Sequence, residues 1–273
     1  MSQMIIFEDV DAKAGPNTPR IVMSAADQVA RFMPHLIHAV SPGELVADAV
    51  EGLKGRCRCT GKDLQMQGAH KSFLSVLTRN GFKGIGSSAG NGSLGIKLPV
   101  GSATPSYTIV LALNIGEGTA NTYSVTRQLI AGYNVDGVLA NQMLSATGAA
   151  NPSETYKNKL LSVGIGANAP YALTSLPAAN AWGVVAVDFN NDTGLVSISR
   201  DGIAWSVAQR EKKGNTIGDT GYVTIGLPSA STGLTDNLIG DFFLFGDSLR
   251  REASDDMIAA LMKALKTDYG VSN

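Results

Sequence analysis

From about residue 94 onward, the chain is a series of short apolar segments separated by turn-forming residues, and this pattern most restricts the fold. Each segment is rich in β-branched and aromatic residues, and Gly, Pro, Asn, Asp or Ser stand between them. The segments are LGIKL (94–98), SYTIVLALNI (106–115), YSVTRQLI (123–130), LLSVGIG (160–166), WGVVAVDF (182–189), GLVSISR (194–200), IAWSVAQ (203–209), YVTIGL (222–227) and LIGDFFLF (238–245). We therefore predict an all-β fold, a two-sheet antiparallel jelly-roll sandwich.

The clearest predicted hairpin covers residues 194–209. Val196 and Ile198 alternate with serines, as in a strand with one buried face. Asp201 and Gly202 follow, and this pair tolerates the positive φ angles of a tight two-residue turn. We predict such a turn between the two strands.

The last predicted strand, residues 238–245, is apolar on both faces. Phe242 and Leu244 alternate with Phe243 and Phe245, so the strand needs cover on both sides. A short C-terminal helix can supply part of that cover. Its signals are Ser254 as the N-cap, the apolar stripe Ile258, Leu261, Met262 and Leu265, and Gly270 at the end.

The first 45 residues show no series of strands. Val29, Phe32 and Met33 have helical spacing until Pro34 interrupts it, and Ser41 can cap a further short element. We predict a partly helical N-terminal arm over residues 1–45, followed by a jelly-roll domain over residues 46–273.

Charge and hydropathy exclude two classes of partner. Charged residues are 16% of the chain and the net charge is -1, so there is no broad basic field for nucleic acid. The sequence contains no apolar run of about 18 residues and no signal-peptide pattern at its start. We expect a protein made in the cytoplasm of its host and not inserted in a membrane.

The two cysteines, Cys57 and Cys59, are separated by one residue. In a strand their side chains would point to opposite faces, so a disulfide between them would be strained, and we predict two reduced, largely inert thiols. His35 and His38 have a spacing that could hold a metal on a helix, but Pro34 precedes them and no third ligand is evident. A surface or packing role is favoured for both.

Three segments resemble one known family. The pattern YVTIG, LIGDFFLFGDSLRREASDDMIAALMKALKTDYGV resembles the carboxyl end of laminin-G-like jelly rolls of the concanavalin A-like lectin/glucanase superfamily. Residues 180–205 are similar to that family's central hairpin, and residues 78–99 to its entry region. The resemblance implies the same sandwich over about residues 75–271. The resemblance says little about function, because function depends on the residues of a site rather than on the fold.

The sequence offers no catalytic constellation, so the prediction is a protein that is not an enzyme. Glycosidases of this superfamily hold their carboxylates on one strand, and the spacing Glu-x-Asp-x-x-Glu is absent here. A different arrangement, with carboxylates from separate loops, stays open.

Two sets of binding residues can be named. Tyr133, in the polar loop AGYNVDG, and Trp205, just after the Asp-Gly turn, are candidates for stacking on sugar rings, although both could simply fill the ends of the sandwich. Asp188, Asn190 and Asp192 offer oxygen ligands for calcium, although a turn explains the same residues. No other cofactor is indicated.

Two functions follow from these expectations. Jelly rolls with N-terminal arms occur among virion proteins, and laminin-G-like sandwiches resembling this one occur in bacteriophage particles. The first hypothesis is a bacteriophage virion structural protein, such as a tail, fibre or capsid-decorating component, that forms a homo-oligomer and contacts other virion proteins. The alternative is a lectin-like adhesin that binds bacterial surface glycans.

Overall fold

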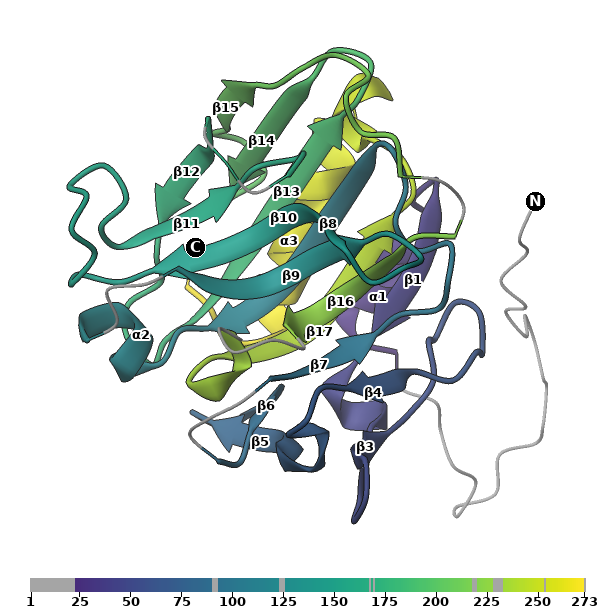
Figure 1. The fold of residues 1–273 in the computed structure, drawn as a ribbon, viewed down its shortest axis with the longest axis vertical. Coiled ribbons are helices and arrows are strands. Elements are labelled where there is room, and N and C mark those ends of the chain that lie inside the picture. The colour runs from purple at the N-terminus through teal and green to yellow at the C-terminus, as the bar shows by residue number, and fades with distance from the viewer. Residues whose placement is uncertain are drawn as a thin grey trace.

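Two antiparallel sheets packed face to face make up most of the described chain (Figure 1). The computed structural model describes residues 23–89, 93–122, 126–166, 168, 170–217, 220–227, 233–252 and 254–272. Within them, the eight-stranded sheet has the order β15-β14-β13-β8-β17-β6-β5, and β1 also pairs with β17. The seven-stranded sheet has the order β12-β11-β10-β9-β16-β7-β4. The predicted all-β sandwich is therefore confirmed.

The strands of the eight-stranded sheet are β1 (Leu36–Val40), β5 (Leu74–Arg79), β6 (Phe82–Ser87), β8 (Tyr107–Asn114), β13 (Trp182–Asn190), β14 (Leu195–Ser199), β15 (Ser206–Gln209) and β17 (Leu238–Phe245). Those of the seven-stranded sheet are β4 (Gln65–Gln67), β7 (Leu94–Lys97), β9 (Arg127–Tyr133), β10 (Leu139–Thr147), β11 (Lys159–Ser162), β12 (Ala172–Ser175) and β16 (Tyr222–Leu227). A separate hairpin contains β2 (Val46–Asp48) and β3 (Gly52–Lys54). The helices are α1 (Ala25–Ala30), α2 (Glu117–Asn121) and α3 (Asp255–Asp268), with 3-10 turns η1 (Pro42–Glu44), η2 (Lys71–Phe73), η3 (Gly233–Thr235) and η4 (Leu249–Glu252).

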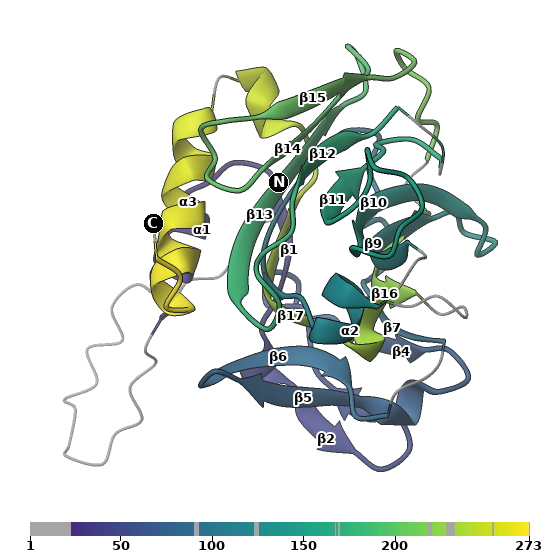
Figure 2. The same ribbon diagram turned by 90° about the vertical axis from the view of Figure 1, so that its left-hand side faces the viewer.

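Strand β17 lies in the middle of the molecule and is buried on both faces, as its sequence predicts. Phe242 and Leu244 belong to the core between the two sheets. Phe243 and Phe245 belong to a second core, beneath α3. The predicted helical stripe of α3 covers this second core, so helix, eight-stranded sheet and seven-stranded sheet form three successive layers (Figure 2).

The predicted two-residue turn at Asp201 and Gly202 is wrong. Strand β14 ends at Ser199 and β15 begins only at Ser206, so residues 200–205 form a longer loop. Gly202 has the expected positive φ of 77°, but Asp201 does not belong to the positive-φ residues. Its carboxylate instead accepts hydrogen bonds from the backbone N–H groups of Ile203 and Ala204. That side-chain cap stabilises the longer loop.

The described part of the predicted N-terminal arm, from residue 23 onward, packs on the sandwich. Helix α1 ends at Ala30, and the chain then continues as β1, which pairs with β17. Ala26, Ala30 and Met33 join the core beneath α3. The sequence shows no series of strands in residues 1–45, and the single strand β1 forms there because the pairing edge of β17 imposes an extended conformation that the local pattern does not indicate.

No helix in the described ranges combines the length and apolar character that crossing a membrane requires.

Candidate functional site

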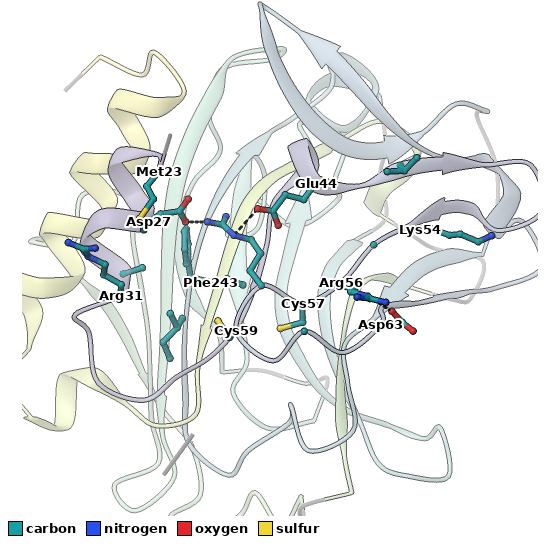
Figure 3. A pocket seen from close by; sticks show the side chains of 17 residues that line it. Met23, Asp27, Arg31, Glu44, Lys54, Arg56, Cys57, Cys59, Asp63 and Phe243 are labelled. Carbon is teal, nitrogen blue, oxygen red and sulfur yellow. Dashed lines mark hydrogen bonds and ion pairs between the residues drawn. The ribbon is translucent and has the colours of Figure 1, made fainter. Parts of the chain in front are cut away.

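A pocket of about 810 Å³ lies where α1, β1 and η1 face the segment 54–63 (Figure 3). Its volume falls within the range of pockets that bind small molecules. The residues that line it are Met23, Asp27, Ala30, Arg31, Leu36, Ala39, Glu44, Val46, Lys54, Gly55, Arg56, Cys57, Arg58, Cys59, Gly61, Asp63 and Phe243. Apolar and charged side chains therefore share one cavity.

Arg58 is the central polar side chain of the pocket. Its guanidinium forms ion pairs with Asp27 of α1, with Glu44 of η1 at 3.4 Å and with Asp241 of β17 at 3.7 Å (Figure 3 shows the first two). The Arg58 side chain is only 19% exposed and the side chains of Asp27 and Asp241 are 13% and 12% exposed, so these two pairs are largely shielded from water. One cation facing three carboxylates leaves the group with an excess of negative charge and of hydrogen-bond acceptors.

Glu44 is the most accessible carboxylate of this group, with 53% of its side chain exposed. Partial burial raises the pKa of Glu44, while the guanidinium of Arg58 acts in the opposite direction. Asp27 and Asp241 add to the upward shift, because further negative charge nearby disfavours ionisation. Glu44 can therefore accept a hydrogen bond from a bound molecule or, when protonated, donate one.

A second hollow, of about 550 Å³, continues from the pocket across β3 and β4. The two hollows share Lys54, Gly55 and Asp63 in their walls. Around this junction, Arg56 pairs with Asp63 at 2.9 Å and Lys54 with Asp48 at 2.5 Å. A ligand longer than a single ring can extend from one hollow to the other.

The predicted stacking residues lie elsewhere. Tyr133 is only 6% exposed and stacks on Tyr222, with ring centroids 5.5 Å apart, and burial raises the pKa of Tyr133 to about 12. Trp205 is half-buried, and the guanidinium of Arg250 lies 4.5 Å from the centre of its ring. Neither ring lines the pocket, and the two do not meet in one platform. Their role in sugar binding stays a prediction.

The predicted calcium ligands have separate protein partners. Asp188 is 2% exposed and accepts hydrogen bonds from the hydroxyl groups of Thr108 and Ser248. The side chain of Asn190 accepts from the backbone of the turn that follows, and Asp192 pairs with Arg251 at 2.6 Å. Among the described residues, no group of three or more His, Cys, Asp or Glu side chains is arranged to hold a metal ion.

Sequence reasoning missed Asp27, Glu44 and Arg58. They are single charged residues in unrelated local patterns, and only the folded chain brings them together. The pocket also contains the two cysteines that the sequence singles out as inert. A charged residue between two cysteines in a chain with few charges is the one local signal that could have drawn attention to Arg58.

The sandwich is similar to several solved structures. No protein-family model matches the sequence, and a search of curated proteins gives no match. A Trypanosoma rangeli sialidase bound to the inhibitor DANA has a TM-score of 0.56 and 16% identity, covering 85% of this chain and 33% of that one. A mutant of the same sialidase with trans-sialidase activity has a TM-score of 0.57 and 15% identity, covering 88% and 34%. The W1252A mutant of HCR D/C VPI 5995 has a TM-score of 0.52 and 16% identity, covering 85% and 52%.

At these identities the likeness shows the fold alone. The chain spans about a third of the sialidase structures and about half of the third structure. The comparisons support a β-sandwich of the jelly-roll kind. None of the three structures is that of a phage protein by name, and none of them supports a virion location, a virion partner or an oligomer.

The prediction that the chain is not an enzyme is contradicted, because the structural neighbours include sialidases. The prediction relied on the absence of one spacing of carboxylates on one strand. That spacing belongs to one arrangement of acids, and loops distant in sequence can bring acids together in other ways, as the pairing of Asp27 and Glu44 around Arg58 illustrates.

Proposed function

We propose that this chain is a carbohydrate-binding sandwich domain that takes a saccharide in the pocket around Arg58. The observation that carries the proposal is the half-exposed carboxylate of Glu44, held by a shielded guanidinium inside a cavity of about 810 Å³. Support also comes from the sandwich fold, which is shared with a sialidase structure in complex with sialic acid at a TM-score of 0.51.

The chemistry of the pocket suits a molecule with many hydroxyl groups. Sugar hydroxyl groups donate to carboxylates such as Glu44 and accept from guanidinium N–H groups such as those of Arg56. Leu36 and Val46 in the wall offer apolar contact to the C–H face of a sugar ring. The second hollow allows a chain of two or more sugar units.

The test is a panel of bacterial polysaccharides and defined oligosaccharides, followed by titration calorimetry of each binder. We expect Glu44→Ala to weaken binding at least about tenfold, because a hydrogen bond to a charged group is worth about 1.5–3 kcal/mol. Glu117→Ala is the matched control, since Glu117 is an exposed carboxylate on α2 outside the pocket. Absence of saturable binding across the panel, or equal affinities for wild type and Glu44→Ala, would overturn the proposal.

Cleavage of a glycosidic bond is the second function that a specific observation favours. Asp27 and Glu44 pair with the same guanidinium, and the pKa of Glu44 is raised by burial, which is the usual property of a general acid. Incubation of each bound oligosaccharide with the protein, followed by detection of new reducing ends, separates cleavage from binding. Glu44→Gln should abolish any cleavage and retain part of the binding.

The virion structural role stays a prediction from the sequence. This hypothesis expects the N-terminal arm, residues 1–45, to dock on a neighbouring subunit. The described part of that arm, from residue 23 onward, contacts the chain's own β17 and α3. Those contacts give no support to docking on a neighbouring subunit.

A further inference from the structure

The segment Cys57–Cys59 forms a turn in the wall of the pocket rather than a strand. The backbone N–H of Cys57 donates to Lys62 O at 2.9 Å, and the N–H of Gly61 donates to Cys57 O at 2.8 Å. Arg56 and Asp63 close this loop through a backbone bridge. In such a turn, residues two apart are not forced to opposite faces. The argument against a Cys57–Cys59 bond therefore does not apply to this chain.

The two thiols share one environment. Both cysteines are free and line the same pocket, Cys57 fully buried and Cys59 half-buried (Figure 3). The Nδ1 atom of His38, which is 5% exposed on β1, lies 3.0 Å from Cys57 Sγ. Hydrogen bonds from the Cys59 thiol, then from His38 and Thr60, lower the pKa of Cys57 to about 3 despite its burial.

The same contact has the opposite effect on Cys59. Its hydrogen bond to Cys57 raises the pKa of Cys59, and burial adds to that shift. Of the two thiols, Cys57 is therefore the one that gives up its proton more readily, and the Nδ1 atom of His38 lies within hydrogen-bond distance of its sulfur. This is the arrangement from which thiol–disulfide exchange proceeds.

We propose that Cys57 and Cys59 are a dithiol–disulfide couple that exchanges with a low-molecular-weight disulfide such as glutathione disulfide. This proposal does not rest on saccharide binding, because its chemistry needs no sugar. It also adjoins the polar centre of the pocket, since Arg58 stands between the two cysteines and its N–H donates to Ala39 O of β1 at 3.0 Å.

The exchange has two steps. In the first, the Cys59 proton passes to the Cys57 sulfur, and the half-buried Cys59 sulfur attacks one sulfur of glutathione disulfide. A bond forms between Cys59 and glutathione, the glutathione disulfide bond breaks, and one glutathione thiolate leaves.

In the second step, His38 takes the proton of Cys57, and the Cys57 sulfur attacks the sulfur of Cys59. The bond between Cys59 and glutathione breaks, and the second thiolate leaves. Starting from a Cys57 thiolate and a Cys59 thiol, the pair loses two electrons and one proton, which His38 holds. Glutathione disulfide becomes two glutathione thiolates, one of which takes that proton from His38 and the other a proton from water.

The experiment equilibrates the full chain with mixtures of reduced and oxidised glutathione, quenches with acid, alkylates the remaining thiols and measures the intact mass. We expect oxidised protein that has lost two hydrogen atoms, takes up no alkylating agent and carries no glutathione. The ratio of oxidised to reduced protein should change tenfold for each 29.6 mV of the glutathione potential, as for a two-electron couple. A stable glutathione adduct in the wild type, or full alkylation at the most oxidising ratio, would overturn the proposal.

Two variants separate the steps. Cys57→Ser should stop at a glutathione adduct on Cys59, and Cys59→Ser should leave the buried Cys57 unmodified. The reverse pattern, with the adduct on Cys57, would contradict the assigned order of attack. If either variant fails to fold, the wild-type masses alone still decide whether the couple exists. His38→Asn, which retains a polar side chain, should slow the closure of the Cys57–Cys59 bond and flatten its dependence on pH, whereas an unchanged pH profile would exclude His38 as the proton acceptor.

Discussion

Tyr269 ties the end of α3 to the middle of β17. Its hydroxyl group accepts from the backbone N–H of Asp241 at 2.7 Å and donates to Asp241 Oδ2 at 3.1 Å, in a buried position. The ring lies over Gly240, where a Cβ would stand 2.5 Å from it. Tyr269 therefore links the helix layer to the central strand of the sandwich.

We expect Tyr269→Phe to lower the free energy of unfolding by about 1–3 kcal/mol, because it leaves the buried N–H of Asp241 without its partner and removes one hydrogen bond from the Asp241 carboxylate. Urea denaturation measures the change. Tyr156→Phe is the matched control, since Tyr156 is partly exposed and no hydrogen bond of its hydroxyl group is described. Equal effects of the two substitutions would show that the Tyr269 hydroxyl contributes nothing specific.

Asp188 should make stability depend on pH. Burial raises the pKa of Asp188 from 3.8 to about 6, against the lowering effect of its bonds to Thr108, Ser248 and Arg250. Between these two values the folded chain binds more protons than the unfolded chain. The contribution of this group to the free energy of unfolding is therefore largest below about pH 4 and is lost as the pH rises through 6.

Asp188→Asn removes that dependence. Relative to wild type, we expect the variant's free energy of unfolding to improve as the pH rises from 4 to 6, by on the order of 1.4 kcal/mol per pKa unit. Urea titrations at several pH values measure this difference. Asp192→Asn, an exposed carboxylate on the same hairpin, controls for the loss of a charge. A difference that does not change with pH would mean that Asp188 is not perturbed as described.

At the scale of elements, the end of α3 fixes the start of α1. Asp268 accepts hydrogen bonds from the backbone N–H groups of Ala25 at 3.1 Å and Ala26 at 2.8 Å. Both N–H groups lie in the first turn of α1, where the helix itself offers no carbonyl group to accept their hydrogen bonds. Asp268, at the end of α3, therefore caps the start of α1, although the two helices are more than two hundred residues apart in the sequence.

We expect Asp268→Ala to cost about 1 kcal/mol of stability, as for the loss of a helix cap. Amide hydrogen exchange should quicken in α1 and remain unchanged in β8, because only α1 loses its partner. Asp256→Ala, at an exposed position in the first turn of α3, is the control. Protection of α1 that survives Asp268→Ala would show that packing on α3 is sufficient without the cap.

Elements defined by their own periodicity were predictable. The alternation of β17 and the stripe of α3 are properties of consecutive residues, and the structure confirms both. Strand β1 was missed because its extended form depends on pairing with β17, about two hundred residues away in the chain. The loop at residues 200–205 was mistaken for a tight turn, because the capping by Asp201 competes with the conformation that an Asp-Gly pair permits.

At the scale of the whole molecule, the candidate site draws its groups from α1, β1, η1, the 54–63 segment and β17. No local pattern connects Asp27 with Asp241, which meet only through Arg58. The cysteine pair was noticed, but a strand was assumed where the chain forms a turn. That its thiols are inert stays a prediction. The sequence thus predicts the two sheets and α3 well. It predicts the pocket around Arg58 poorly, because residues far apart in the sequence form that pocket.

The packing of the helix layer on a shared sheet predicts a single cooperative transition. Trp182 lies in the core beneath α3, with its ring centroid 4.6 Å from that of Tyr269, and its N–H donates to Arg79 O. In Trp205→Phe, Trp182 is the single remaining tryptophan and reports on this layer. Its fluorescence and the far-UV circular dichroism of the strands should give the same urea midpoint.

Leu261→Ala in that background tests the coupling directly. Leu261 is fully buried in α3, and its truncation should cost about 2–5 kcal/mol. If the layers unfold together, both midpoints fall by the same amount, because the loss beneath the helix is transmitted through β17 to the core between the sheets. Lys263→Ala, exposed on the same helix, should move neither. A fall in the fluorescence midpoint alone would show that α3 detaches from a sandwich that remains folded, and the three layers would then be two folding units.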